Sequence, residues 1–413
     1  MAFVVQQEER LVNESVRQVY EQAWQEYLRS GRVYSYYAST MAVWDATIYE
    51  ARTYPGLCVE LAEPIDPTRL AAAAQAVAKL YPYATFDIGR SGSRICFTRR
   101  DDYALTIAND RPEGQYVVIG YEGNLLSVSM SHVIADGFGN YAFANALLNA
   151  YVGNKPPEFQ DLTQPDFVAD LMACDLPLPA GYEMHDFAAQ NPFVVPEPEA
   201  EEPHVATYRM KAKALAEYCK PYGMSKQVAL SFAMAKAITL VHPEDTRTIC
   251  VRGPVNTHRR LGVPNSFQNS SLPHVFLNMS PSELSDDPSP AIAQRLKEDL
   301  AAQTTYEHLA AVTNHFGRLT RKAGEDEDAF LAAFMDYMNK SDVLVSNLGQ
   351  AIGDEVAPHV KDIHLIAPPS YPLTLYCAGF GDTLKLRLTT RVTTDAYAEA
   401  LAQVLGKLGA QKE

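Results

Sequence analysis

The sequence predicts an α/β fold with two lobes, each a mixed β-sheet flanked by helices. Its 413 residues are 47% hydrophobic and 21% charged, so the chain can bury a core large enough for two domains or lobes. Segments with the two-residue period of strands alternate with segments of helical period. A strand followed by a helix opens the second half as it opens the first, and a proline-rich stretch separates the halves.

The first lobe is expected over residues 1–165. Residues 1–30 carry apolar side chains at helical spacing, which predicts an amphipathic helix. Asp66 and Pro67 are typical of a helix start and predict a helix over 69–80. Short apolar runs predict strands at 57–61, 84–88, 93–98, 115–121 and 125–132, and a further helix is expected over 141–152.

Residues 166–204 are expected to form a crossover linker, because prolines crowd there and its acidic tail, 197–202, is not expected to pack. The second lobe is expected over residues 205–413. Its predicted strands are 205–210, 248–255, 342–345, 371–379 and 383–392, and its predicted helices are 212–222, 226–240, 288–322, 329–339 and 394–408.

The composition excludes several classes of function. A net charge of −15 argues against a nucleic-acid-binding protein and against docking on an anionic membrane. Six scattered cysteines without a Cys-x-x-Cys pair favour reduced thiols in a cytoplasmic protein over disulfides or a zinc site. The start of the chain has no signal-peptide pattern, and the longest apolar stretch, 228–241, is too short to span a bilayer. No metal site is expected, and His308 and His315 are expected at the surface.

The strand at 125–132 leads into the segment with the most distinctive chemistry. Its apolar residues alternate with serines and place His132 at the strand end, on the apolar face. Asp136 and Gly137 follow in a glycine-rich turn that precedes a helix. A strand end holds a histidine rigidly, as catalysis requires, although such a histidine can also be a core residue and an Asp-Gly pair a plain turn.

The segment from His132 to Gly137 resembles the His-x-x-x-Asp-Gly motif of the chloramphenicol acetyltransferase superfamily, which includes condensation domains, BAHD acyltransferases and alcohol acetyltransferases. Residues 252–262 resemble an arginine-bearing segment of its second lobe, and 346–349 resemble the Ser-Asn-x-Gly turn of the alcohol acetyltransferases. The resemblance implies two acetyltransferase-like lobes with an active-site tunnel at their interface. Ser131 stands where many members have a second histidine, and the Asp-Phe-Gly-Trp-Gly motif of the plant branch is absent.

The resemblance also implies roles for the motif residues. His132 is the expected general base, since the ordinary pKa of histidine lies near neutrality. Asp136 is expected to pair with an arginine of the second lobe, Arg259 or Arg260, with Arg252 as a further candidate, although a solvated turn aspartate remains an alternative. Gly137 is expected to let the backbone pass close beneath the pocket.

Second-lobe residues are expected to complete the site. Ser346 and Asn347, or backbone N–H groups near them, are candidates for binding the oxyanion or the substrate, although a structural turn is equally compatible with them. Asn256 is a further candidate, either as a latch between strands or as an ordinary strand-end asparagine. Tyr371 and Tyr376 lie near the predicted pocket strands and could line the pocket or belong to the core.

These features predict an acyltransferase that moves an acyl group, other than an aminoacyl group, from a coenzyme A thioester to a hydroxyl or amine of a small molecule. The carbonyl carbon of a thioester is already electrophilic, so the reaction requires neither a metal nor a covalent intermediate. Coenzyme A is expected as a co-substrate, and no permanently bound cofactor is expected. One alternative is a stand-alone condensation-type domain whose donor is tethered to an acyl or peptidyl carrier protein, with a landing patch formed by Lys211, Lys213, Lys220 and Lys226. The other is a binding module that keeps the fold without catalysis.

Overall fold

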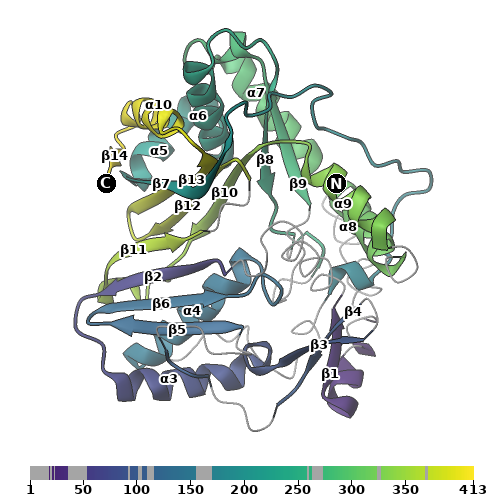
Figure 1. Cartoon of the computed structure of the whole chain (residues 1–413), viewed down its shortest axis with the longest axis vertical. Coiled ribbons are helices and arrows are strands. Elements are labelled where there is room, and N and C mark those ends of the chain that lie inside the picture. Colours follow the sequence, from purple (N-terminus) through teal and green to yellow (C-terminus); the bar gives the residue numbers. More distant parts are fainter. Residues whose placement is uncertain are drawn as a thin grey trace.

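The structure is a computed structural model, and it describes residues 18, 21–22, 24–35, 54–91, 94–100, 105–108, 116–154, 170–257, 260–262, 273–322, 327–367 and 371–413. Sheets and helices alternate in two halves that are stacked on one another (Figure 1). The α/β fold class is confirmed. None of the helices in the described part of the chain combines the length and apolar character needed to cross a membrane.

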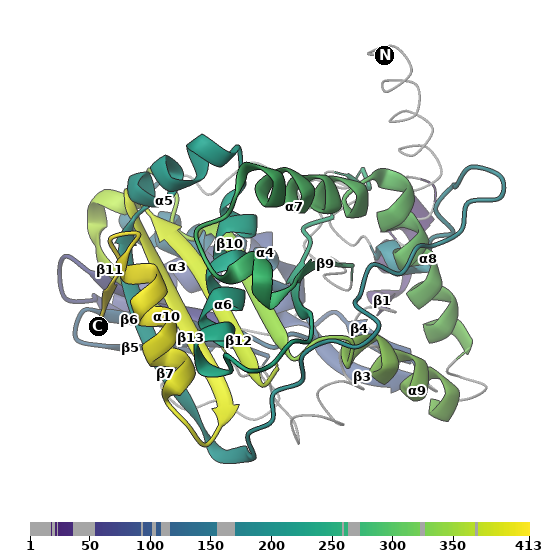
Figure 2. The ribbon, with the colours of Figure 1, turned by 90° about the horizontal axis from the view of Figure 1, so that it is seen from above.

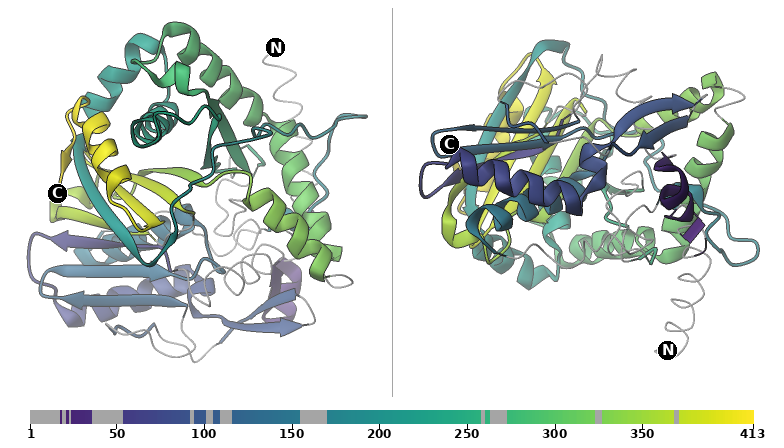
Figure 3. Two further views of the ribbon diagram at one scale, coloured as in Figure 1. Left: turned by 45° about the horizontal axis from the view of Figure 1, so that its top comes forward. Right: turned by 90° about the horizontal axis from the view of Figure 1, so that it is seen from below.

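The first half is built on an antiparallel sheet that contains the motif-bearing strand. Its order is β11-β2-β6-β5, and α3 and α4 pack together against it (Figure 3). Leu126, Val128 and Met130 of β6 are buried, as their alternation predicted. The elements are β2 (Gly56–Leu61), α3 (Pro67–Leu80), β5 (Val117–Glu122), β6 (Leu125–Met130) and α4 (Gly137–Val152).

A strand from the second half completes this sheet. β11 (Val360–Ile366) runs antiparallel to β2, with Ile363 opposite Val59. Val360, Ile363 and Leu365 are buried in the core of the first half, which holds the strand in place. Residues 360–366 were given no element by the sequence pattern, and their pairing ties the two halves together beside the cavity described below.

The second half is built on a seven-stranded sheet of order β14-β7-β13-β12-β10-β8-β9. β10 is parallel to β8 and β12, and the other pairs are antiparallel, so the sheet is mixed as predicted. Helices α6 and α10 lie side by side over it (Figure 2). The strands are β7 (Glu199–Lys211), β8 (Ile249–Pro254), β9 (His274–Met279), β10 (Val343–Gln350), β12 (Leu373–Phe380), β13 (Thr383–Val392) and β14 (Gln411–Lys412), and the helices are α5 (Ala212–Cys219), α6 (Lys226–Val241), α7 (Pro290–Gln303) and α10 (Ala396–Gly406).

A third, small sheet and two helices lie at one side of the molecule, to the right in Figure 1. The sheet has the order β1-β4-β3 and is antiparallel. Phe330 and Phe334 of α9 stack with ring centroids 5.8 Å apart and join the core of the first half. The elements are β1 (Arg32–Ser35), β3 (Asp87–Ser91), β4 (Arg94–Thr98), α8 (Tyr306–Lys322) and α9 (Glu327–Met338).

Several predicted boundaries were wrong. The strand expected over 84–88 is a 3-10 turn, Pro82–Thr85, followed by β3. The helix expected over 288–322 is two helices, because Thr305 begins a new one by accepting the N–H of His308 at its hydroxyl. The helix expected over 1–30 falls mostly outside the described residues, but those of its residues that are described, 18, 21–22 and 24–30, are helical. Residues 155–169, around the predicted end of the first lobe, also lie outside the described residues.

The acidic stretch expected to stay unpacked is partly a strand. β7 begins at Glu199, whose position opposes Val392 of β13. Residues 199–204 have only one strand neighbour, because β14 pairs with residues 208 and 209 alone. Acidic side chains on such an edge remain in solvent and discourage further strand pairing, so their charge is compatible with the sheet.

Candidate active site

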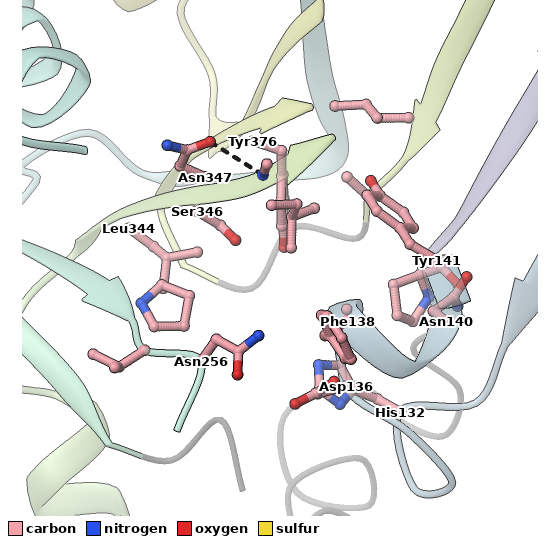
Figure 4. Close-up of a pocket in the computed structure, with 18 of the residues that line it drawn as sticks. His132, Asp136, Phe138, Asn140, Tyr141, Asn256, Leu344, Ser346, Asn347 and Tyr376 are labelled. Carbon is pink, nitrogen blue, oxygen red and sulfur yellow. Dashed lines mark hydrogen bonds between the residues drawn. The ribbon is translucent and has the colours of Figure 1, made fainter. Parts of the chain in front are cut away.

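A cavity of about 320 Å³ lies where the two halves meet. The first half lines it with residues from the start of β2 and from the segment between β6 and α4, and the second half lines it from β8, β9, β10, α9, β11 and β12 (Figure 4). The predicted site residues that reach it are His132, Asp136, Gly137, Asn256, Ser346 and Asn347, and both tyrosines that could line the pocket, Tyr371 and Tyr376, do so. Tertiary structure therefore brings both predicted groups of residues to one cavity.

His132 lies two residues beyond the end of β6, in a tight turn. The turn is closed by the N–H of Ile134, which donates to the carbonyl oxygen of Ser131 at 2.9 Å. Burial lowers the pKa of His132, and a hydrogen bond to its own main chain raises it by a smaller amount. The net effect keeps the imidazole neutral at neutral pH. One ring nitrogen then carries a lone pair that can accept a proton.

Asp136 begins α4. Its backbone is extended, and its Oδ1 accepts the N–H of Gly139 at 3.0 Å, so Asp136 is the helix N-cap and the helix starts four residues earlier than predicted. The side chain lies at the cavity wall but is only 4% exposed. Burial raises the pKa of Asp136 to about 7, against smaller lowering effects of hydrogen bonds from the N–H groups of Gly139 and Phe138.

No arginine forms an ion pair with Asp136 among the described residues. Arg260 is exposed, and Arg259 lies outside the described residues. Arg252 is fully buried and donates elsewhere, to the hydroxyl of Tyr371 at 2.6 Å and to the carbonyl oxygen of Tyr337 at 2.8 Å. A pairing of Asp136 with Arg259 therefore stays a prediction.

Gly137 and Leu348 bring the two halves into close contact. A Cβ atom on Gly137 would lie 2.7 Å from Cδ2 of Leu348, which is well inside van der Waals contact. Leu348 belongs to β10, and Gly137 is the first residue of α4. The absence of a side chain at position 137 thus lets the start of α4 approach the second half closely at the cavity.

Ser346, Asn347 and Asn256 line the second-half side of the cavity (Figure 4). The first two were predicted in a turn, but they belong to β10, whose register shifts between Asn347 and Gln350. The Oδ1 of Asn347 accepts the N–H of Gly349 at 3.2 Å. The hydroxyl of Ser346 has no hydrogen-bond partner within the described residues, and Asn256 extends toward the His132 side of the cavity (Figure 4).

Sequence reasoning missed several lining residues. Phe138, Asn140 and Tyr141 are among the first five residues of α4, and the N-cap at Asp136 is the signal that would have found them. His274 stands at the start of an apolar strand, and its position at a strand end was the available signal. Phe334 and Met338 come from α9, which nothing in the local sequence connects with the motif.

The two helical histidines of α8 were expected at the surface, and for His308 this was wrong. His308 is 5% exposed and packs edge-on against Phe187, with ring centroids 5.1 Å apart. The amphipathic pattern of α8 is compatible with this burial because the chain around Leu176, Pro177 and Phe187 packs against the outer side of the helix. Among the described residues, no group of His, Cys, Asp or Glu side chains is arranged as metal ligands.

No protein-family model and no curated protein matches the chain. Solved structures match its fold. TRI101 from F. sporotrichioides, crystallised with coenzyme A and T-2, superposes with a TM-score of 0.61 at 14% identity, over 87% of this chain and 96% of that one. TRI3 trichothecene 15-O-acetyltransferase from Fusarium sporotrichioides gives 0.59 at 11% identity, over 91% and 94%. Polyketide synthase associated protein 5 from Mycobacterium tuberculosis gives 0.54 at 15% identity, over 85% and 93%. At such identities the likeness is one of fold, and this chain has the chloramphenicol acetyltransferase-like fold that its motifs predicted.

Proposed function

We propose that this protein is an acyltransferase that transfers an acyl group from a coenzyme A thioester to a hydroxyl or amine of a small molecule, with His132 as general base. The observation that carries the proposal is the position of His132. Its imidazole, held neutral by burial, lines a cavity between the two halves of an acetyltransferase-like fold. A base of this kind is what acyl transfer requires from the protein.

The proposed reaction balances without a covalent enzyme intermediate. The acceptor oxygen or nitrogen attacks the thioester carbonyl carbon while its proton passes to His132. The C–O or C–N bond forms, and the tetrahedral intermediate collapses with cleavage of the C–S bond. The leaving thiolate takes the proton from His132, so the products are the acylated acceptor and free coenzyme A, and the base is regenerated.

The carbonyl oxygen becomes negatively charged in this step, and the second half supplies candidate donors for it. The hydroxyl of Ser346 faces the cavity, and the side chain of Asn256 extends toward His132 (Figure 4). A donor positioned before the reaction stabilises the developing charge without reorganisation. We therefore assign oxyanion binding to Ser346, with Asn256 as a second donor to the oxyanion or the substrate.

Coenzyme A is the proposed donor because TRI101 and this chain share a fold, and TRI101 was crystallised with coenzyme A. No observation favours a carrier protein instead. Of the four lysines considered for a landing patch, Lys211 pairs with Asp382 at 3.7 Å and Lys213 with Glu217 at 3.8 Å, which offsets their charge. Nor does any observation favour an inactive module, since the cavity extends to His132.

The test is replacement of His132 with alanine. Consumption of acetyl-CoA, followed by release of free thiol in the presence of acceptor, should fall by about 10²–10⁴-fold, the range typical of a general base. His359→Ala is the matched control, because His359 is exposed and does not line the cavity. Full activity of the His132 variant would overturn the proposal.

A further inference from the structure

The charge of the cavity wall restricts the acceptor, if the proposed function holds. Among the described lining residues there is no lysine, arginine or glutamate, and Asp136 supplies the one aspartate. Much of the wall is apolar and comes from both halves. It includes Phe334, Met338, Leu344, Leu348, Leu365 and Ile366.

The carboxylate of Asp136 is poorly placed to bind a cation in this cavity. It accepts the N–H groups of Gly139 and Phe138 at the N-terminus of α4, and the residue is 4% exposed. The positive end of the helix dipole already stabilises any negative charge at this position. A cationic acceptor would find no other carboxylate on the described wall.

A positive charge lies directly behind the wall. Arg252 is fully buried, and its guanidinium donates to the hydroxyl of Tyr371 at 2.6 Å; Tyr371 itself lines the cavity. This fixed charge repels a cation in the cavity. Arg252 itself does not line the cavity, so it offers no direct ion pair to a carboxylate there.

We propose that the acceptor is a neutral, largely apolar alcohol. An ammonium group would lose its water without gaining an ionic partner, and it would have to lose a proton before it could attack. A carboxylate-bearing acceptor would likewise be desolvated without a partner. An uncharged hydroxyl suits the cavity, since apart from Asp136 the polar groups on the described wall are hydroxyls, amides and imidazoles, which can hydrogen-bond to it. The apolar remainder of the wall can cover an apolar body.

Three acceptors built on one phenethyl skeleton test this inference: phenethyl alcohol, phenethylamine and 4-(2-hydroxyethyl)benzoate. Each is offered with acetyl-CoA at neutral pH, with thiol release as the activity assay and calorimetry as the binding assay. The alcohol should bind most tightly, and its kcat/KM should exceed that of either charged compound by at least about 10-fold, because each charge must be buried without a partner.

A pair of variants isolates the effect of charge. Leu344 lines the cavity and is 5% exposed, and Leu344→Glu and Leu344→Gln differ only in the charge that they place there. The ratio of amine to alcohol activity should be about 10-fold higher in the glutamate variant, because the carboxylate supplies the missing partner. Ile366→Glu and Ile366→Gln repeat the comparison at a partly exposed lining position that tolerates polar groups more easily.

The outcomes separate this inference from the proposed function. The inference would be overturned if a charged acceptor were used as well as the alcohol or better, or if the alcohol did not bind more tightly. It would also be overturned if the glutamate variants behaved as their glutamine controls. His132-dependent thioester consumption would still support acyl transfer in that case. Loss of that dependence would overturn the proposed function and this inference with it.

Discussion

Asparagine in place of Asp136 should remove a large pH dependence from the stability of the protein. Asn keeps the oxygen that accepts the N–H of Gly139, so the helix cap survives, but it cannot titrate. The pKa of Asp136 rises from 3.8 to about 7 in the folded protein. Between these two values the folded state keeps a proton that the unfolded state has lost. The free energy of unfolding therefore falls as pH rises through this interval.

The magnitude follows from the size of the shift. A shift of about three pKa units corresponds to roughly 4 kcal/mol in total, at about 1.4 kcal/mol for each unit. Part of this loss occurs below about pH 5. Between about pH 5 and pH 8.5 the free energy of unfolding of the wild type should therefore fall by about 2–3 kcal/mol relative to that of Asp136→Asn. Asp136→Ala should be less stable than Asp136→Asn by about 1 kcal/mol at every pH, because the cap is removed and neither side chain titrates.

Urea unfolding of the three proteins at several pH values, followed by circular dichroism, measures these differences. A constant difference between wild type and Asp136→Asn would refute the burial argument. The opposite slope, with the wild type gaining stability as pH rises, would indicate that a cation pairs with the carboxylate. Arg259→Gln would then identify the partner, since loss of the pairing should restore the slope predicted from burial.

Three further predictions follow from the site. Because burial lowers the pKa of His132, the acid limb of kcat/KM should have its midpoint below 6.5, and a midpoint above 6.5 would contradict the neutral imidazole. Ser346→Ala should lower kcat by about 10²-fold with little change in KM if the hydroxyl binds the oxyanion, whereas a change in KM alone would assign it to substrate binding. Gly137→Ala should cost no more than about 1 kcal/mol of stability in denaturant unfolding, because the Cβ meets only the end of the partly buried Leu348 side chain, which can shift. The same change made in a Leu348→Ala background should cost less, and equal costs would place the strain elsewhere.

The local sequence predicted the parts of the fold that depend on neighbouring residues. The alternation that ends at Met130 is a property of one strand, and it correctly placed Leu126 and Val128 in the core. The start of α4 was misplaced, because Gly137 and Gly139 indicated a turn, whereas the cap at Asp136 and packing against the second half stabilise a helix. The strand ends of β7 and β10 were also misplaced, since their extra residues are ordered by partners in β13 and β12.

The sequence by itself determined the α/β class, the order of most elements and the segment that carries His132, because strand period, helix caps and motif spacing are encoded within a few residues. Only the tertiary structure decided that β11 completes the first sheet beside β2, and that Ser346, Asn256 and His132 line one cavity. It also decided the protonation of Asp136, whose pKa depends on burial rather than on its neighbours in the chain. These properties arise when distant segments exclude water together, and no local pattern records which segments will meet.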